Sequence, residues 1–196
     1  MKNFKTTLKA SSILTFITAI IIVFNSCERT TNSSGSQSEL DSLRNQVKEL
    51  TKTNELITKN LVKFDTLDFN VFSRRDWARF HESHAEDVIV HFPDGHTTKG
   101  LKKHIDDMEA MFVYAPDTRI KEHPIKIGQG NMTAVTGIME GTFTKPMPDG
   151  KGGFIQPTGK KFKLPMATIG IWKEDGTMSE EYLFWDNQSY MKQIGL

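Results

Sequence analysis

A single carboxylate ends an aromatic segment near the C-terminus, in EEYLFWDNQSY, residues 180–190. Asp186 directly follows a run of large apolar side chains in a predicted strand. Side chains alternate faces along a strand, so Asp186 shares one face with Glu180, Tyr182 and Phe184. If that face lines a closed interior, burial raises the pKa of Asp186 and suits its carboxyl group to proton transfer near neutral pH. The alternative is an aspartate that caps the strand end or meets solvent.

The preceding predicted strand, residues 160–172, would supply the floor of a cavity. Its residues Met166, Thr168, Gly170 and Trp172 share one face, and the small Thr168 and Gly170 between two large side chains leave a hollow. A cavity that is apolar with few polar groups is the usual site for a small molecule. The residues expected to contact such a ligand are Trp77, Met108, Phe112, Met166, Thr168, Trp172, Glu180, Tyr182 and Phe184.

The elements that must position these residues form a predicted α+β domain from residue 65 onward. Apolar residues recur at helical spacing over residues 73–87, which Ser73 would cap, and over residues 101–112. A short strand, residues 88–92, lies between these helices. Four strand segments follow, at residues 118–127, 132–143, 160–172 and 177–186. This order indicates helices packed on one face of a curved antiparallel sheet.

The composition of the 196-residue chain, 37% hydrophobic and 25% charged, is typical of one globular domain with appendages. Residues 1–26 combine three lysines with an apolar run, Ile13 to Phe24, as a signal peptide does. Cys27, the only cysteine, resembles in its position the lipidated cysteine of bacterial lipoproteins. A permanent membrane span and a free buried thiol are the alternatives. Removal of residues 1–26 would change the net charge from +1 to −2, and no basic cluster indicates nucleic-acid binding.

Two segments connect the signal peptide to the domain. Residues 27–38 are small and polar and are expected to form a flexible tether. Residues 39–64 carry the alternating spacing of three and four that is typical of a coiled coil, at Leu40, Leu43, Val47, Leu50, Asn54, Ile57, Leu61 and Phe64. Asn54 falls at an a position, where a buried asparagine pair fixes the register of a parallel dimer. We therefore expect a homodimeric coil, with an amphipathic helix packed on its own domain as the alternative.

Several motifs of the domain can be compared with known families. They are DWARFHESHAEDVIVHFPDG at its start, the turn PTGKKF, Glu180 with Tyr182, and Asp186 before the ending MKQIGL. Together they resemble the SnoaL-like polyketide cyclases, or ester cyclases, of the nuclear transport factor 2-like fold, over residues 65–196. The resemblance implies a cone of helices on a curved sheet. It also implies that Asp186 is the general acid and base of an aldol ring closure that uses no metal or organic cofactor.

This chain departs from that family at one position of the predicted site. The polyketide cyclases of the family carry a histidine fourteen residues before the aspartate, where this chain has Trp172. His91 on the first strand is our candidate for the missing hydrogen-bond donor, so Asp186 and His91 form the predicted catalytic pair. The alternative for His91 is a strand-end histidine satisfied by the backbone.

No metal or cofactor is expected from the sequence. The six histidines, His81, His84, His91, His96, His104 and His123, show no spacing that fixes three zinc ligands. The function is either cofactor-free acid/base catalysis on a small apolar molecule or capture of such a molecule by a lipoprotein. A third interpretation makes the coil the functional part and the domain a docking head. We expect a homodimer anchored through Cys27 to a bacterial membrane, facing the periplasm or the cell surface.

Overall fold

The computed structural model describes residues 33–196. The chain divides into two units, Met1–Lys48 and Glu49–Leu196, and each is described by itself. The predicted signal peptide and Cys27 lie outside the described residues. Within residues 33–196, no helix has both the length and the apolar character that crossing a membrane requires.

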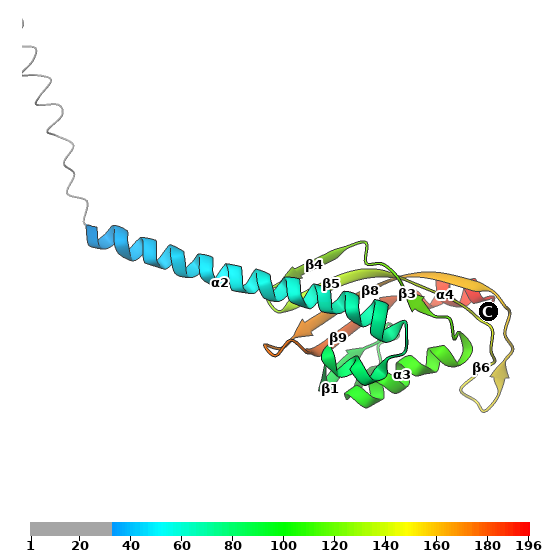
Figure 1. The fold of residues 1–196 in the computed structure, drawn as a ribbon. Coiled ribbons are helices and arrows are strands. Elements are labelled where there is room, and N and C mark those ends of the chain that lie inside the picture. The colour runs from blue at the N-terminus through cyan, green and yellow to red at the C-terminus, as the bar shows by residue number, and fades with distance from the viewer. Residues whose placement is uncertain (1–32) are drawn as a thin grey trace, which may run out of the picture. The chain divides into compact units, whose positions relative to one another are not determined.

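One long helix, α2 (Ser33–Thr66), covers the segment predicted to form a coil (Figure 1). Leu40 and Leu43 of the first unit are exposed. In the second unit, Leu61 packs against a buried hydrophobic cluster and Phe64 is fully buried. The end of the helix therefore packs on its own domain, as the alternative interpretation held. Pairing of the exposed stretch with a second chain stays a prediction.

A short 3-10 helix, η3 (Trp77–Glu82), and the start of a strand at His84 replace the α-helix predicted over residues 73–87. Before them, the π-helical turn η2 (Leu67–Phe72) continues α2. The prediction of a helix capped by Ser73 is wrong. The Ser73 hydroxyl instead accepts a hydrogen bond from the Ile120 amide at 2.8 Å, which ties the end of η2 to the sheet.

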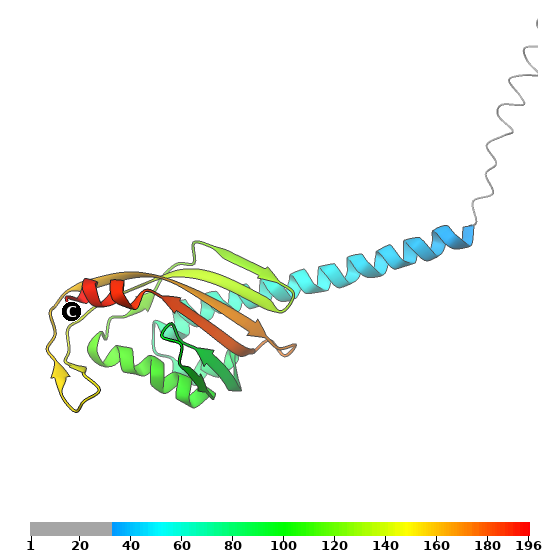
Figure 2. The ribbon, with the colours of Figure 1, turned by 180° about the vertical axis from the view of Figure 1, so that it is seen from behind.

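The second unit is built on a seven-stranded sheet. Its strands are β1 (His84–His91), β2 (Thr97–Lys99), β3 (Arg119–Ile120), β4 (Lys126–Gln129), β5 (Met132–Thr142), β8 (Lys161–Trp172) and β9 (Met178–Trp185). The order is β2-β1-β9-β8-β5-β3, and β4 also pairs with β5. Because β1 pairs with β9 in parallel, the sheet is mixed and not purely antiparallel as predicted. Figure 2 shows the curvature of the long strands.

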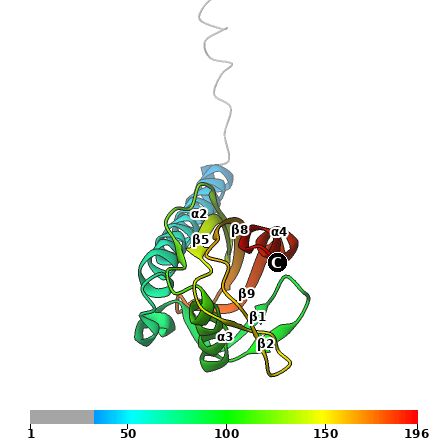
Figure 3. The same cartoon turned by 90° about the vertical axis from the view of Figure 1, so that its right-hand side faces the viewer.

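The remaining elements surround this sheet. The helix predicted over residues 101–112 is confirmed as α3 (Leu101–Tyr114), and a last helix, α4 (Asn187–Ile194), follows β9. A separate hairpin of β6 (Met147–Pro148) and β7 (Phe154–Ile155) lies between β5 and β8 in the sequence. Figure 3 shows α3 beside the sheet. Leu101 and Met108 of α3 pack with Trp172 of β8 in one hydrophobic cluster, so the helix covers the inner face of the sheet.

A β-bulge in β9 decides which side chains point to this inner face. Trp172 of β8 pairs with Met178, but the neighbouring Ile171 pairs with Glu180, so Ser179 is an extra residue in β9. One extra residue shifts the register by one and turns every later side chain to the opposite face of the sheet. The odd-numbered residues from 181 to 185 therefore point toward the helices.

Candidate functional site

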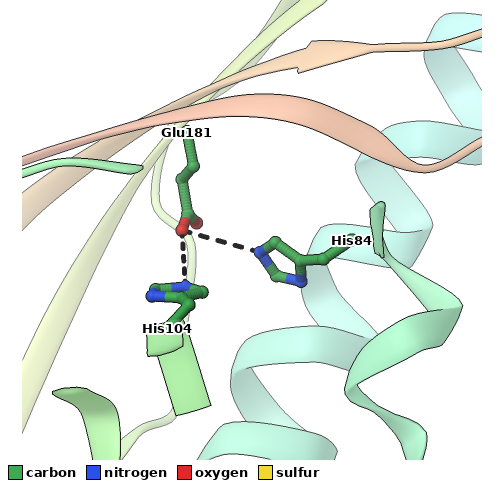
Figure 4. A group of neighbouring side chains, drawn as sticks. All are labelled: His84, His104 and Glu181. Carbon is green, nitrogen blue, oxygen red and sulfur yellow. Dashed lines mark ion pairs between the residues drawn. The ribbon is translucent and has the colours of Figure 1, made fainter. Parts of the chain in front are cut away.

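Three buried ionisable side chains meet on the inner face of the sheet (Figure 4). His84 begins β1, His104 lies in α3 and Glu181 lies in β9. Glu181 Oε2 is 2.9 Å from His104 Nε2 and 3.6 Å from His84 Nε2. The three residues are 1%, 2% and 4% exposed, in the order His84, His104, Glu181. Elements far apart in the sequence thus bring one carboxylate and two imidazoles out of contact with bulk water.

Local contacts fix the ring of His84. The Ser83 hydroxyl donates to the Phe80 carbonyl at 3.2 Å, and His84 Nδ1 lies 3.0 Å from the same hydroxyl oxygen. Because the hydroxyl hydrogen is already used, this network assigns the ring hydrogen to Nδ1, which donates it to Ser83. The Phe80 ring stacks on the imidazole with 4.3 Å between the ring centroids. The other ring nitrogen, His84 Nε2, therefore faces Glu181 and has no aligned hydrogen-bond partner among the described residues.

Burial and the contacts between Glu181 and the imidazoles together shift the pKa values of Glu181 and His104. Burial alone would raise the pKa of Glu181, but the imidazoles of His104 and His84 outweigh it and hold that pKa far below its usual range. For His104 burial is the larger effect, and it lowers the pKa of the ring in spite of Glu181. At neutral pH the site therefore holds an ionised Glu181 beside an uncharged His104.

Several polar atoms of this group are unsatisfied. His84 Nε2, His104 Nδ1 and Glu181 Oε2 are buried and have no aligned hydrogen-bond partner among the described residues. More than nine-tenths of buried polar groups in proteins do have such a partner, because an unmade hydrogen bond costs roughly 1–3 kcal/mol. His84 Nε2 and His104 Nδ1 therefore remain open to a polar partner, while Glu181 Oε2 lies 2.9 Å from His104 Nε2.

The three side chains line a small cavity with a mostly apolar wall. Its volume is about 50 Å³, which holds roughly one or two water molecules, at about 30 Å³ for each, or part of a small organic molecule. The other residues of the wall are Leu67, Asp68, Phe72, Phe80, Met108, Met111, Ile120, Met139, Met166, Thr168, Leu183 and Trp185. Four of these are methionines, whose flexible side chains can adapt to the shape of a ligand. An apolar wall with a few convergent polar groups is typical of a small-molecule site.

Of the residues predicted to contact a ligand, Met108, Met166 and Thr168 belong to the cavity wall. Trp77, Phe112 and Trp172 instead belong to the hydrophobic clusters beside the cavity. The hollow predicted at Gly170 is filled, since a β-carbon added there would lie within 3.1 Å of three neighbouring side chains. The cavity thus lies beside Thr168, nearer the middle of β8.

The prediction that Glu180, Tyr182 and Phe184 face the cavity is wrong, because the bulge at Ser179 turns them to the outer face. There the Tyr182 ring stacks on His91 with 4.1 Å between the ring centroids. The Tyr182 hydroxyl donates to Glu180 Oε2 at 2.8 Å, and His91 Nε2 lies 3.3 Å from the same oxygen. His91 therefore belongs to a partly exposed cluster on the opposite face of the sheet from His84.

Asp186 lies at the N-terminus of α4. Its carboxylate accepts hydrogen bonds from the amides of Gln188 and Ser189 at 2.9 and 3.1 Å, as a helix N-cap does. The side chain is exposed and borders, with Phe184, an open depression on the outer face of the sheet. The predicted position of Asp186 inside the cavity is wrong, because the bulge reverses the faces and the helix amides hold the carboxylate. A catalytic role for Asp186 stays a prediction.

Sequence reasoning missed the group of His84, His104 and Glu181. The sequence presents the two histidines only among possible zinc ligands, and the alternation that places Glu180 on the inner face places Glu181 on the outer face. One feature could have drawn attention to it, the pair Glu180–Glu181 in a strand rich in apolar residues. Adjacent side chains in a strand point to opposite faces, so one of the two glutamates has to face the interior.

The comparisons with known proteins agree on the fold. Residues 65–194 match the family model described as SnoaL-like polyketide cyclase. A structure named as a SnoaL-like polyketide cyclase from Jannaschia sp. CCS1 superposes with a TM-score of 0.58 and 19% identity, covering 70% of this chain and 92% of that one. IdmH from Streptomyces antibioticus, named as a polyketide cyclase, gives 0.55 and 19%, covering 65% and 93%.

A third structure has no assigned activity. An NTF2-like protein of unknown function from Burkholderia pseudomallei K96243 superposes with a TM-score of 0.55 and 17% identity, covering 70% of this chain and 98% of that one. At these identities the solved structures establish the α+β fold and leave the chemistry open. No curated protein matches the chain.

Proposed function

The chain belongs to the SnoaL-like polyketide cyclase family, and from this premise we propose that its cavity binds a small carbonyl compound and removes a proton from one of its carbon atoms. Family membership supports a cyclase-type or small-molecule-binding role. The finer proposal names His84 as the proton acceptor and requires no metal or organic cofactor. It places the reaction on the inner face of β9 and not on the aromatic face around Asp186.

One observation carries this proposal: an unpartnered imidazole nitrogen, His84 Nε2, lies 3.6 Å from a buried carboxylate on the wall of an apolar cavity. A neutral imidazole is the side chain best matched to proton transfer near pH 7. An anion beside it stabilises the imidazolium that forms, and the surrounding apolar wall strengthens this attraction because it excludes water.

The proposed reaction begins when His84 Nε2 takes a proton from the carbon next to the carbonyl group. The electron pair of the broken C–H bond then delocalises onto the carbonyl oxygen as an enolate. Glu181 stabilises the charged His84, and His104 contacts the same carboxylate oxygen at 2.9 Å and holds it in place. In a ring closure, the enolate carbon would attack a second carbonyl group of the same molecule. The volume of the cavity, about 50 Å³, favours a compact substrate over a molecule of several fused rings.

Exchange of carbon-bound hydrogen tests the proposal without knowledge of the natural substrate. We expect the protein to accelerate replacement of the α-hydrogens of cyclopentanone by deuterium in D₂O, measured by proton NMR. Met108→Trp fills the cavity and should abolish the acceleration. Val113→Trp is the matched control, since Val113 lies on the same helix and is 53% exposed.

Three outcomes would contradict the proposal. The first is exchange no faster than in buffer, and the second is equal exchange in the Met108→Trp and Val113→Trp variants, with folding confirmed by circular dichroism. The third is stoichiometric metal in the purified protein whose removal by a chelator stops exchange. Cyclopentanone binding without exchange would favour the second candidate function, a non-catalytic binder, which the apolar wall also supports.

The location of the protein is part of this proposal. We propose that Cys27 is lipidated and that the mature protein is anchored to a bacterial membrane facing the periplasm or the cell surface. The support is the sequence alone, in which an apolar run and small Ser26 precede the single cysteine.

We also propose that the exposed part of α2 pairs with a second copy of this chain in a parallel coiled coil. Leu40, Leu43, Val47 and Leu50 are between 48% and 64% exposed, and burial of each such side chain in a seam stabilises the pair. We expect the mature chain to sediment as a dimer at micromolar concentration. Asn54→Leu should raise the thermal stability of the dimer and loosen the choice of oligomer, because it removes a polar residue at an a position. A monomer in sedimentation would contradict the coil.

A further inference from the structure

A second carboxylate, Asp68, reaches the wall of the same cavity from a different element. It lies in the π-helical turn η2, and π-helical turns are rare and often mark functional positions. Asp68 is 8% exposed. Burial is the main cause that raises the pKa of Asp68 above its usual range, and the negative charge of Glu181 acts in the same direction. Asp68 is therefore close enough to the group of His84, His104 and Glu181 to interact with it electrostatically.

The carboxylate of Asp68 is connected to the surface through one histidine. His123 Nε2 lies 2.8 Å from Asp68 Oδ2, and His123 Nδ1 lies 2.9 Å from Asp65 Oδ1. The side chain of His123 is 1% exposed, that of Asp68 is 11% and that of Asp65 is 28% exposed. Lys126 pairs with the other oxygen of Asp65 at 2.8 Å. The three side chains thus form a continuous hydrogen-bonded chain from the cavity to solvent.

The contacts of His123 determine the protonation state of its ring. A neutral imidazole has one N–H group and one lone pair, whereas ionised carboxylates only accept hydrogen bonds. Because both ring nitrogens of His123 face carboxylate oxygens, both carry hydrogen and the ring is an imidazolium. The pKa of His123 is raised accordingly, since the two aspartates outweigh the opposing effect of burial. The ring can therefore release the proton on Nε2 to Asp68 and regain one at the same nitrogen, while Nδ1 keeps its hydrogen toward Asp65.

We propose that Asp65, His123 and Asp68 form a proton store beside the cavity, in which His123 supplies a proton to Asp68 and Asp68 gives it to the bound molecule. This inference rests on the proposed function of the cavity. It assigns a catalytic role to Asp68 and a positioning and relay role to His123. A molecule that uses both sides of the cavity has an acidic C–H group and an oxygen that accepts a proton, as in a ketone or a β-hydroxy carbonyl compound.

The proposed step balances in protons and electrons. His84 takes a proton from carbon, and the electron pair of the C–H bond becomes the carbon–carbon double bond of an enol. Asp68 takes a proton from His123 Nε2 and gives it to the carbonyl oxygen. When the enol returns to the ketone, its oxygen gives the proton back to Asp68, and Asp68 returns one to His123 Nε2. The charged groups that face this proton store are Lys126 at its outer end and Glu181 and His84 across the cavity.

The first test is independent of any ligand. In nitrogen-15 NMR of the full mature chain at pH 7, we expect both ring nitrogens of His123 to be protonated. Asp68→Asn should lower the pKa at which His123 loses its charge, because one of the two stabilising carboxylates is removed. A singly protonated His123 at pH 7 in the wild-type protein would overturn the inference.

The second test measures cyclopentanone exchange. Asp68→Asn should lower the rate at least 10-fold, and Asp106→Asn, at an exposed position of α3, should leave it unchanged. His123→Gly should lose a similar factor and regain activity when imidazole is added to the buffer, which a purely structural role would not produce. If the Asp68→Asn variant exchanges cyclopentanone at the wild-type rate, this inference fails and the proposed function still stands. If the wild type shows no exchange, the proposed function fails and this inference fails with it.

Discussion

Glu181→Gln should lower the rate of cyclopentanone exchange by roughly 10²-fold to 10⁴-fold, the range lost when the carboxylate that stabilises a charged histidine becomes an amide. Glutamine keeps the shape of Glu181 and one hydrogen-bonding oxygen, but it carries no negative charge. Proton uptake by His84, 3.6 Å away, then places an unpaired positive charge in an apolar cavity. The measurement is the exchange rate per folded protein at pH 7.

Glu180→Gln is the matched control because it makes the same chemical change one residue away on the opposite face of β9. Glu180 contacts His91 and Tyr182 on the outer face, and its side chain is 37% exposed. We expect its exchange rate to stay within about twofold of the wild-type rate, since such partly exposed ion pairs contribute little. Loss of exchange in Glu180→Gln with retention in Glu181→Gln would restore the outer face, with Asp186 and His91, as the active one.

The same substitution should alter the dependence of stability on pH. The pKa of Glu181 is depressed in the folded protein. The stability that its ionisation contributes is therefore complete above the unfolded-state value of 4.5 and is lost as the pH falls below it. Glu181→Gln should remove this part of the acid sensitivity, which urea unfolding between pH 3 and pH 7 would measure.

Phe64→Ala should lower the free energy of unfolding by about 3–5 kcal/mol, the usual cost of deleting a buried phenylalanine ring. Phe64 is fully buried at the end of α2. Its ring packs edge-on against Trp172 with 5.6 Å between the ring centroids and against His123 at 6.4 Å. Truncation leaves a void in the core between the helix and the sheet, which the surrounding side chains fill only in part.

Val62→Ala provides the control for the end of the helix. Val62 is 58% exposed, two residues before Phe64 on the same helix. An exposed substitution of this kind changes stability by about 0.5 kcal/mol or less. Equal losses in the two variants, by urea unfolding, would contradict the placement of Phe64 in the domain core.

Local sequence patterns were sufficient to predict the class of the fold. The period-two segments at residues 132–143, 160–172 and 177–186 form long strands almost at the predicted bounds. The helical spacing over residues 101–112 predicts α3. In these segments hydrophobic periodicity and turn residues agree, so the local pattern and the tertiary packing favour the same structure.

The orientation of the last strand could not be predicted in the same way. From the pair Trp172–Met178, uninterrupted pairing would have brought Glu180 opposite Gly170 and placed the even-numbered residues inside, as the sequence analysis expected. The extra residue Ser179 reverses this. A bulge depends on how the strand pairs with its neighbours, and an isolated serine in the sequence does not indicate one. Because the sequence does not reveal this extra residue, the predicted site lies on the wrong face of the sheet.

The group of His84, His104 and Glu181 could not be predicted for a different reason. Its members lie 20 and 77 positions apart along the chain, on a strand, a helix and another strand. Only the tertiary fold brings them together, and no local spacing reports it. The same holds for His123 between Asp65 and Asp68. The sequence supplies the histidines, but their partners follow from strand order and helix placement.

The most direct test of the proposed function is to determine where a small carbonyl compound binds. Methionine methyl groups labelled with carbon-13 provide the probes, because Met108, Met111 and Met139 line the cavity while Met132 is 45% exposed elsewhere. During titration with cyclopentanone, we expect saturable chemical-shift changes at the three cavity methyl groups and none at Met132. Unchanged cavity methyl groups, in a protein that still accelerates exchange, would contradict the claim that the chemistry occurs on the inner face of the sheet.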